Sequence, residues 1–202
     1  MSIIFADKLN KTFKTTLLHS VSFVLNAGVG MGIQGYNGCG KSTLLDILAG
    51  LQKQSGGTLT INTTIGYVMQ KCGFQEGLTC LDNLRLEAAL CGLKGKIAEK
   101  RVDELVCSCL LEGFIKTRAD KMSAGMRGRL ALALALMPNP GLLLLDEAFS
   151  ALDEHSKNHF KALLGSLKLS GTAILMVSHN TDDFIGLCEY VLSFPGEEVA
   201  AL

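Results

Sequence analysis

Short apolar runs of strand length recur along the chain and alternate with longer stretches of helical periodicity. The runs predict strands at Ile3–Phe5, Val21–Leu25, Thr58–Ile61, Ile65–Met69, Leu142–Leu145, Ala173–Val177 and Tyr190–Phe194. The stretches between them predict helices at Lys41–Ala49, about Leu81–Leu90, about Ile97–Leu111, Ala124–Leu136, Glu154–Leu169 and Asp182–Cys188. Such alternation is typical of an α/β domain with a mostly parallel sheet.

The segment Arg129–Met137 has a pattern that fits two kinds of element. Leucines occupy every second position from Leu130 to Leu136, which is the period of a strand, but alanines fill the positions between them. Alanine is the best helix former and is poor in strands. We therefore predict a helix here that is buried on most of its sides.

The middle of the chain differs in composition from its two ends. Residues 71–120 carry much of the charge and have helical character. This predicts one domain in which a helical lobe, about residues 71–137, is inserted into an α/β core formed by about residues 1–70 and 138–202.

A glycine-rich run, Gly35–Thr43, matches the phosphate-binding pattern G-x-x-x-x-G-K-[ST]. Its glycines allow backbone N–H groups to approach phosphate oxygens, and the following helix directs its positive end at the same anion. Lys41 adds a positive charge, and Ser42 offers a hydroxyl to Mg²⁺. The alternative is a glycine-rich turn before an ordinary helix. The candidate nucleotide contacts are Gly35, Asn37, Gly38, Cys39, Gly40, Lys41, Ser42 and Thr43.

Two acidic residues, Asp146 and Glu147, end the apolar strand Leu142–Leu145. Ligands of open α/β sheets bind at the carboxyl ends of the strands, so both carboxylates are expected near the phosphate loop. Asp146 suits Mg²⁺, and Glu147 suits the polarisation of an attacking water. The alternative is a strand that runs into an acidic helix cap.

Charge, hydropathy and cysteine content exclude several classes of protein. The net charge of zero argues against a nucleic-acid-binding surface spread over the whole molecule. No apolar run reaches the roughly 18 residues of a membrane span, and we find no signal peptide. The seven cysteines lack framework spacing and are expected to be reduced thiols. The pair Cys107 and Cys109 predicts small buried side chains in preference to a metal site.

With these motifs in order, the chain resembles the nucleotide-binding domain of ABC transporters over about residues 3–194. The phosphate loop and the strand ending at Asp146 and Glu147, the family's Walker B strand, carry most of the resemblance. Further motifs follow the family's order. These are Phe13 as the adenine-stacking aromatic, Gln70 as the Q-loop glutamine, Met122–Met126 as the signature, Ser150–Asp153 as the D-loop and His179 as the switch histidine.

The resemblance implies a P-loop NTPase fold with an N-terminal antiparallel β part and an ATPase activity that uses ATP and Mg²⁺. Gln70 would contact Mg²⁺ or the attacking water, and His179 the γ-phosphate. The family's ATPase is a head-to-tail dimer, so Ser123 and Gly125 would hold the γ-phosphate bound to a second copy or a homologous cassette. Asp153 belongs to the same set of expected nucleotide-site residues.

The family also implies a membrane partner. A separate membrane-spanning subunit would dock on the helical lobe, particularly at Cys72–Leu90, and the chain would be cytoplasmic and peripheral to the membrane. The pair Met126 and Arg127 resembles the signature of one-cassette exporter subunits and predicts export. No nucleic-acid partner is expected.

The signature departs from the usual Leu-Ser-Gly-Gly-Gln at three positions, including Ala124 and Met126. If position 124 requires positive φ, alanine costs on the order of 1 kcal/mol. Two alternatives stay open: a cytosolic ABC-type ATPase of an assembly pathway, and a weakly active regulatory subunit of a heterodimer. The D-loop and His179 argue against a small-molecule phosphate-loop kinase.

Overall fold

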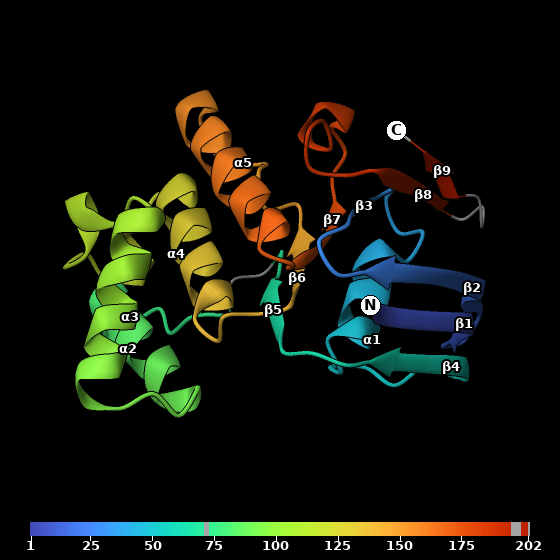
Figure 1. Cartoon of the computed structure of the whole chain (residues 1–202), viewed down its shortest axis with the longest axis horizontal. Coiled ribbons are helices and arrows are strands. Elements are labelled where there is room, and N and C mark those ends of the chain that lie inside the picture. Colours follow the sequence, from blue (N-terminus) through green and yellow to red (C-terminus); the bar gives the residue numbers. More distant parts are fainter. Residues whose placement is uncertain (71–72, 195–198, 202) are drawn as a thin grey trace.

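A computed structural model of the chain describes residues 1–70, 73–194 and 199–201. Figure 1 shows two sheets and a group of helices at the end of the molecule away from the N-terminus. The strands are β1 (Ser2–Thr12), β2 (Thr16–Asn26), β3 (Gly30–Gly35), β4 (Gly56–Ile61), β5 (Ile65–Val68), β6 (Leu142–Asp146), β7 (Ala173–Val177), β8 (Tyr190–Phe194) and β9 (Val199–Ala201). The α-helices are α1 (Lys41–Leu48), α2 (Cys80–Leu90), α3 (Gly95–Ser108), α4 (Ala124–Leu136) and α5 (Glu154–Leu169).

The larger sheet has six strands in the order β5-β6-β7-β3-β8-β9, and all but β9 are parallel to their neighbours. The smaller sheet is antiparallel, in the order β2-β1-β4. The predicted fold class, a mostly parallel core with an N-terminal antiparallel part, is therefore confirmed. No described helix combines the length and the apolar character that crossing a bilayer requires.

Strands β6 and β7 are buried along their whole length, and their alternate side chains enter two different apolar clusters. Leu142 and Leu144 pack with α1 and the antiparallel sheet. Leu143 and Leu145 pack with α2, α4 and α5. Because both faces are covered, these strands are continuous apolar runs, as in other parallel sheets. The carboxyl end of β6 is thereby fixed between two packed layers.

The sequence prediction missed strand β3, the strand that leads into the phosphate loop. Its sequence, Gly-Met-Gly-Ile-Gln-Gly, is rich in the residue least typical of strands. Tertiary packing requires glycine here, since a Cβ at Gly30 would lie 1.9 Å from the Leu187 carbonyl oxygen and one at Gly32 would lie 2.9 Å from the Phe184 ring. Close packing against the segment before β8 has overridden local propensity.

The predicted helix Asp182–Cys188 is wrong. The structure has only a 3₁₀ turn, Thr181–Asp183, followed by turns that lead to β8. Gly186 adopts φ 78°, a left-handed conformation that ends helical structure. Phe184 and Leu187 are fully buried, whereas Ile185 is exposed, so the apolar run reflects a packed turn.

The leucine–alanine segment is the helix that was predicted, and α4 spans Ala124–Leu136. Ser123 caps it, because its Oγ accepts a hydrogen bond from the Met126 N–H at 3.2 Å. Helices α2, α3 and α4 form the group that we call the helical lobe. Its buried side chains belong to the same apolar cluster as α5 and one face of the parallel sheet.

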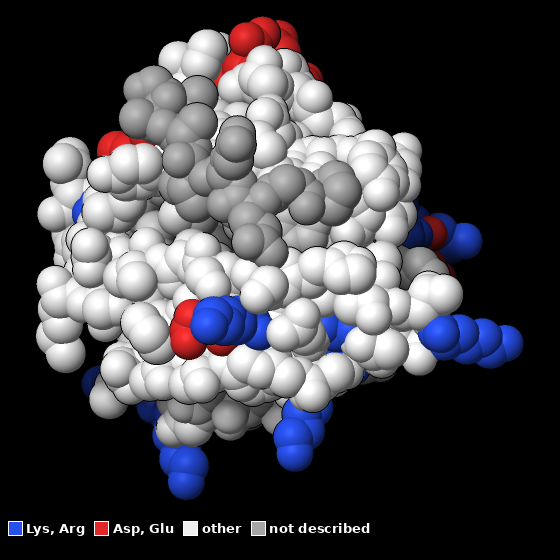
Figure 2. Space-filling view, turned by 90° about the vertical axis from the view of Figure 1, so that its right-hand side faces the viewer, with Lys and Arg blue, Asp and Glu red and all other residues white. Residues whose placement is uncertain are grey.

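Figure 2 shows the end of the molecule that carries the antiparallel sheet. On the described part of this face, Lys and Arg side chains are scattered and form no continuous patch, and some lie beside Asp or Glu. Binding to nucleic acid usually uses a continuous basic patch. The expected absence of a nucleic-acid partner stays a prediction.

Candidate functional site

The phosphate loop connects β3 to α1 and uses left-handed backbone at two glycines. Gly38 has φ 83° and Gly40 has φ 110°, conformations that side chains disfavour. Helix α1 begins at Lys41, so its N-terminus faces the loop. The buried Lys41 Nζ donates to the carbonyl oxygens of Gly35, at 2.8 Å, and Tyr36, at 3.0 Å. The ammonium group is thus held inside the curve of the loop.

The acidic pair lies at the carboxyl end of β6, where Asp146 is buried and Glu147 leaves the strand. Glu147 has φ 53°, which is rare for a residue with a Cβ and costs on the order of 1 kcal/mol. Its N–H donates to the Val177 carbonyl at 3.1 Å. Strain of this kind clusters at functional sites, because it directs a side chain to one place.

His179 follows β7, and its Nε2 lies 3.2 Å from Oε1 of Glu147. That oxygen is buried, yet it accepts no hydrogen bond from any residue that the structure describes. Burial raises the pKa of Glu147 above the ordinary value, while the neighbouring His179 opposes the rise. Oε1 therefore faces His179, and the Glu147 carboxylate lines the same cavity as the phosphate loop, where a carboxylate is suited to polarise a water.

Burial also raises the pKa of Asp146, and a hydrogen bond from the Ser42 hydroxyl opposes the rise. The nearby ammonium of Lys41 likewise favours the charged carboxylate. A buried carboxylate beside a hydroxyl is a typical pair of oxygen ligands for a hard cation. The chemistry at this position therefore fits Mg²⁺.

A short polar network that the sequence analysis did not foresee supports His179. Ser178 is buried, and its Oγ donates to Asp183 Oδ2 at 2.6 Å and accepts from the Asn180 N–H at 3.1 Å. These bonds close the loop on both sides of His179. Each residue type is common in turns, so only the folded structure reveals the pairing.

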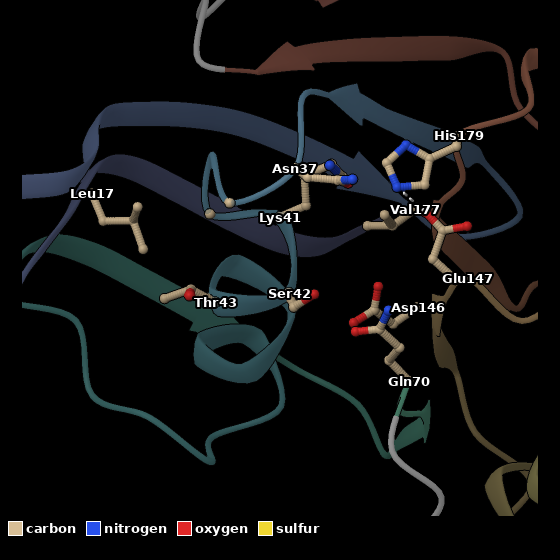
Figure 3. Close-up of a pocket in the computed structure, with 12 residues that line it drawn as sticks. Leu17, Asn37, Lys41, Ser42, Thr43, Gln70, Asp146, Glu147, Val177 and His179 are labelled. Carbon is tan, nitrogen blue, oxygen red and sulfur yellow. Dashed lines mark ion pairs between the residues drawn. The ribbon is translucent and has the colours of Figure 1, made fainter.

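The residues of the phosphate loop, the acidic pair and His179 surround one cavity of about 410 Å³. Figure 3 shows Glu147 and His179 side by side at one end of it and Leu17, from β2, at the other. The cavity is lined by Leu17, Asn37, Gly38, Gly40, Lys41, Ser42, Thr43, Gln70, Asp146, Glu147, Val177 and His179. The structure therefore brings together residues from β2, the phosphate loop and the ends of β5, β6 and β7.

Three predicted residues near the loop do not line this cavity. Phe13 is 58% exposed and packs under the ammonium group of Lys11, whose Nζ lies 4.9 Å from the ring centroid. Cys39 is buried, and Gly35 is the last residue of β3, whose carbonyl accepts from Lys41. Two apolar residues do line the cavity, Leu17 and Val177, and the sequence analysis named neither as a site residue.

The signature and D-loop residues also lie outside this cavity. Ser123 and Gly125 are at the N-terminus of α4, and Asp153 caps α5 by accepting from the Ser156 N–H at 2.8 Å. Ala124 is the first residue of α4 and is not among the residues with positive φ. The strain considered for this alanine is therefore absent from the described structure.

Comparison with known proteins agrees with this geometry. The family model for the ABC transporter matches residues 18–150. A teichoic acids export ATP-binding protein of Enterococcus faecalis is 31% identical over 95% of this chain and 43% of its own length. An aliphatic sulfonates import ATP-binding protein of Bacillus thuringiensis is 34% identical over 93% of this chain and 78% of its own length.

A solved structure, described as the dimeric, post-hydrolysis state of the ATP-binding cassette MJ0796 bound to ADP and Pi, has a TM-score of 0.92 with 25% identity. The alignment covers 98% of both chains. The chain spans less than half the length of the teichoic acids export relatives, 43% and 40% of each. The family match, the cavity and the fold agree: the chain belongs to the ABC transporter family as an ATP-binding cassette.

Proposed function

We propose that the chain is the ATP-binding and ATP-hydrolysing subunit of an ABC transporter and powers transport through a separate membrane-spanning subunit. The observation that carries the proposal is the single cavity in which Lys41, Asp146 and the pair Glu147–His179 converge. A cationic loop and a carboxylate that line the same cavity form the arrangement that phosphoryl transfer to water requires.

ATP is the proposed substrate, with its phosphates on the loop and the N-terminus of α1. Lys41 would exchange its contacts with the Gly35 and Tyr36 carbonyls for phosphate oxygens. Leu17 offers an apolar contact at the far end of the cavity. For Phe13, stacking on adenine stays a prediction, which needs the exposed ring to reach over the cavity mouth.

We assign Mg²⁺ to Ser42, Asp146 and Gln70, because all three line the cavity and each offers an oxygen ligand. When bound, the ion would neutralise charge on the phosphate oxygens. Glu147 would hold and deprotonate the attacking water, and His179, whose Nε2 lies 3.2 Å from Glu147 Oε1, would orient Glu147 and contact the γ-phosphate.

The site of one chain is proposed to be half of a complete site. Ser123 and Gly125, the signature residues, are at the N-terminus of α4 and outside the cavity. A second copy or a homologous cassette in head-to-tail orientation would bring its signature to this cavity. The dimeric state described for the structurally similar cassette supports this arrangement.

The proposal is tested by the ATPase rate per chain as a function of protein concentration. A sandwich dimer predicts that the rate per chain rises with concentration and then reaches a plateau, because each active site needs two chains. A constant rate per chain, with only monomer in light scattering, would contradict the shared site. Absence of hydrolysis at every concentration would favour a weakly active regulatory subunit instead.

The helical lobe is the proposed docking surface for the membrane subunit. A second cavity, of about 770 Å³, is lined by side chains that include Leu93, Ile97 and Met137. Ile97 is 70% exposed, and Leu90 at the end of α2 is 72% exposed. The sequence analysis expected docking at Cys72–Leu90, of which Cys72 lies outside the described residues. Exposed apolar side chains around a groove are typical of protein interfaces.

Replacement of Ile97 by glutamate is expected to reduce recovery of a multi-spanning protein about tenfold or more, because disruption of an interface anchor costs about 2 kcal/mol or more. The measurement is an affinity pull-down of the Glu147→Gln chain, with ATP and Mg²⁺, from gently solubilised membranes. Leu169→Glu is the matched control, since Leu169 is 91% exposed at the end of α5. Equal recovery in both variants would remove Ile97 from the interface.

The alternative of a cytosolic assembly ATPase would be favoured if that pull-down recovered only soluble proteins. Export was predicted from Met126 and Arg127. That direction stays a prediction, because the similar proteins include an export and an import ATP-binding protein.

A further inference from the structure

Helix α4 packs closely against the D-loop, Ser150–Asp153, of its own chain. A Cβ at Gly125 would lie 3.2 Å from the Ala151 carbonyl oxygen, and one at Gly128 would lie 3.5 Å from Leu152 Cδ2. These glycines are three residues apart and share one face of α4 with Arg129. The absence of two side chains lets the helix approach the D-loop backbone.

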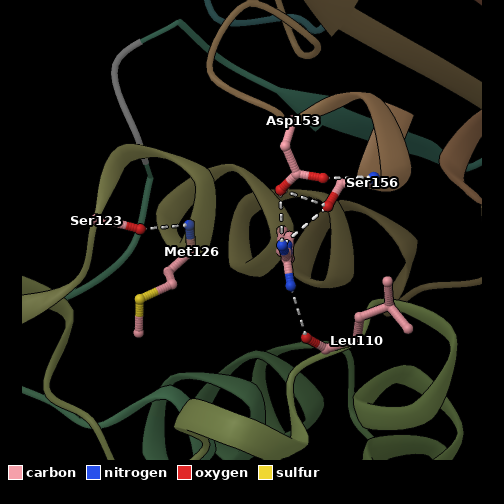
Figure 4. A network of polar contacts seen from close by, with 6 residues as sticks. Leu110, Ser123, Met126, Asp153 and Ser156 are labelled. Carbon is pink, nitrogen blue, oxygen red and sulfur yellow. Dashed lines mark hydrogen bonds and ion pairs between the residues drawn. The ribbon is translucent and has the colours of Figure 1, made fainter. Parts of the chain in front are cut away.

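Arg129 fixes this contact from its C-terminal side. Its Nη2 donates to Ser156 Oγ at 2.8 Å and lies 3.3 Å from Asp153 Oδ2, while Nη1 donates to the Leu110 carbonyl at 3.4 Å. Figure 4 shows Asp153 and Ser156 on one side of this network and Leu110 on the other. One guanidinium therefore joins α4, the start of α5 and the turn after α3.

The D-loop leads directly back to Glu147. The Ser150 N–H and hydroxyl both donate to the Glu147 carbonyl, at 3.1 Å and 2.8 Å. At its other end, Asp153 caps α5 through Ser156. Hydrogen bonds from Ser156 lower the pKa of Asp153, so its carboxylate stays charged and available to Arg129. The segment is held at both ends and along the α4 face.

We propose that Arg129 is a positioning residue for ATP hydrolysis: it holds the helix that presents Ser123 and Gly125 at a fixed distance from the loop that carries Glu147. The inference rests on the proposed function. In a head-to-tail dimer, Glu147 acts in the site of its own chain and Ser123 acts in the site of the partner. Arg129 would then fix the geometry of the two sites relative to each other.

A merely structural ion pair is the competing explanation. Exposed ion pairs contribute little to stability, and the Asp153 side chain is 62% exposed. The Arg129 side chain is only 23% exposed, and its partner Ser156 is fully buried. A structural role would change the free energy of unfolding without a selective effect on kcat. A positioning role therefore predicts a selective loss of kcat, and a structural role predicts a loss of stability.

The experiment compares Arg129→Met with Arg127→Met. Arg127 is on the same helix, but its contacts are Glu76, at 3.7 Å, and the Asp120 carbonyl, at 3.5 Å, neither of which belongs to the D-loop. Arg129→Met is expected to lower kcat about 10- to 100-fold, the effect of misplacing a reacting group by roughly 1 Å. Affinity for a fluorescent ADP is expected to stay unchanged, whereas Arg127→Met should keep both quantities.

Arg129→Lys is expected to have an intermediate kcat, because lysine keeps the charge but cannot make three separate contacts. Asp153→Asn removes the carboxylate and retains a residue that caps helices. If Arg129 acts through Asp153, the double variant Arg129→Met/Asp153→Asn loses less activity than the product of the two single losses. Should Arg129→Met fail to fold, the lysine and asparagine variants and their combination decide the question.

Equal kcat in Arg129→Met and Arg127→Met would overturn the inference, as would a parallel loss of ADP affinity and of thermal stability that lysine does not restore. Failure of the proposed function looks different, since the unmodified chain would then hydrolyse no ATP at any concentration. The wild-type rate is therefore measured first, and the variants are compared with it.

Discussion

Replacement of Glu147 by glutamine is expected to lower kcat for ATP about 1000-fold while ATP binding persists, which is the range that a general base contributes. Glutamine keeps the size of the side chain but replaces the ionisable carboxylate, which lies 3.2 Å from His179 Nε2, by a neutral amide. The left-handed backbone at position 147 and the bond from its N–H to Val177 are retained, so the loop geometry should not change.

The same variant is expected to accumulate as a dimer with ATP, because the complete site forms but does not turn over. Single-turnover hydrolysis gives the rate, and size-exclusion chromatography with light scattering gives the mass. Glu99→Gln is the matched control, since Glu99 is exposed on α3, far from the cavity lining. A Glu147→Gln protein with the wild-type rate would show that Glu147 is not the base and would make His179 the next candidate.

The parts of the site that sequence predicts well are those encoded by neighbouring residues. The phosphate loop fixes its own geometry through Gly38, Gly40 and the start of α1. The acidic pair is similarly recognisable, because the strand before it is continuously apolar. In both cases a short segment contains the chemical groups and the backbone signals that position them.

The parts that sequence misses depend on contacts between distant segments. Strand β3 was not foreseen, since its glycines are explained only by Leu187 and Phe184 packing against it. The helix predicted after His179 is wrong for the same reason. Phe184 and Leu187 are buried and three residues apart, which resembles a helical pattern, but they belong to a turn in which Gly186 is left-handed. Local propensity was a poor guide wherever tertiary packing decided the conformation.

Side-chain networks are the part of the structure that is hardest to predict from the sequence. Ser178 and Asp183 support His179, and Arg129 reaches Asp153 across 24 positions of sequence. An arginine on a helix predicts nothing about its partner, since most helical arginines are solvated. Leu17 likewise reaches the cavity beside the phosphate loop only because the fold brings β2 next to that loop.

Replacement of Lys41 by alanine is expected to weaken ATP binding about 10- to 100-fold, since charge-assisted hydrogen bonds contribute about 1.5–3 kcal/mol. Lys41 is the first residue of α1, and its buried ammonium is held inside the loop by the Gly35 and Tyr36 carbonyls. Its loss leaves the loop glycines in place but removes the only lysine or arginine side chain that lines the described cavity.

Equilibrium titration with a fluorescent ATP analogue measures the effect of Lys41→Ala, and thermal unfolding verifies that the variant is folded. Lys100→Ala is the control, because the Lys100 side chain is 80% exposed on α3 and pairs only weakly with Glu104 at 3.9 Å. Undiminished affinity in Lys41→Ala, with the fold intact, would contradict the placement of the phosphates on this loop. A selective loss of ATP and ADP binding, with the control unchanged, ties the nucleotide to the loop, because no other described cationic side chain from a helix or strand enters the cavity.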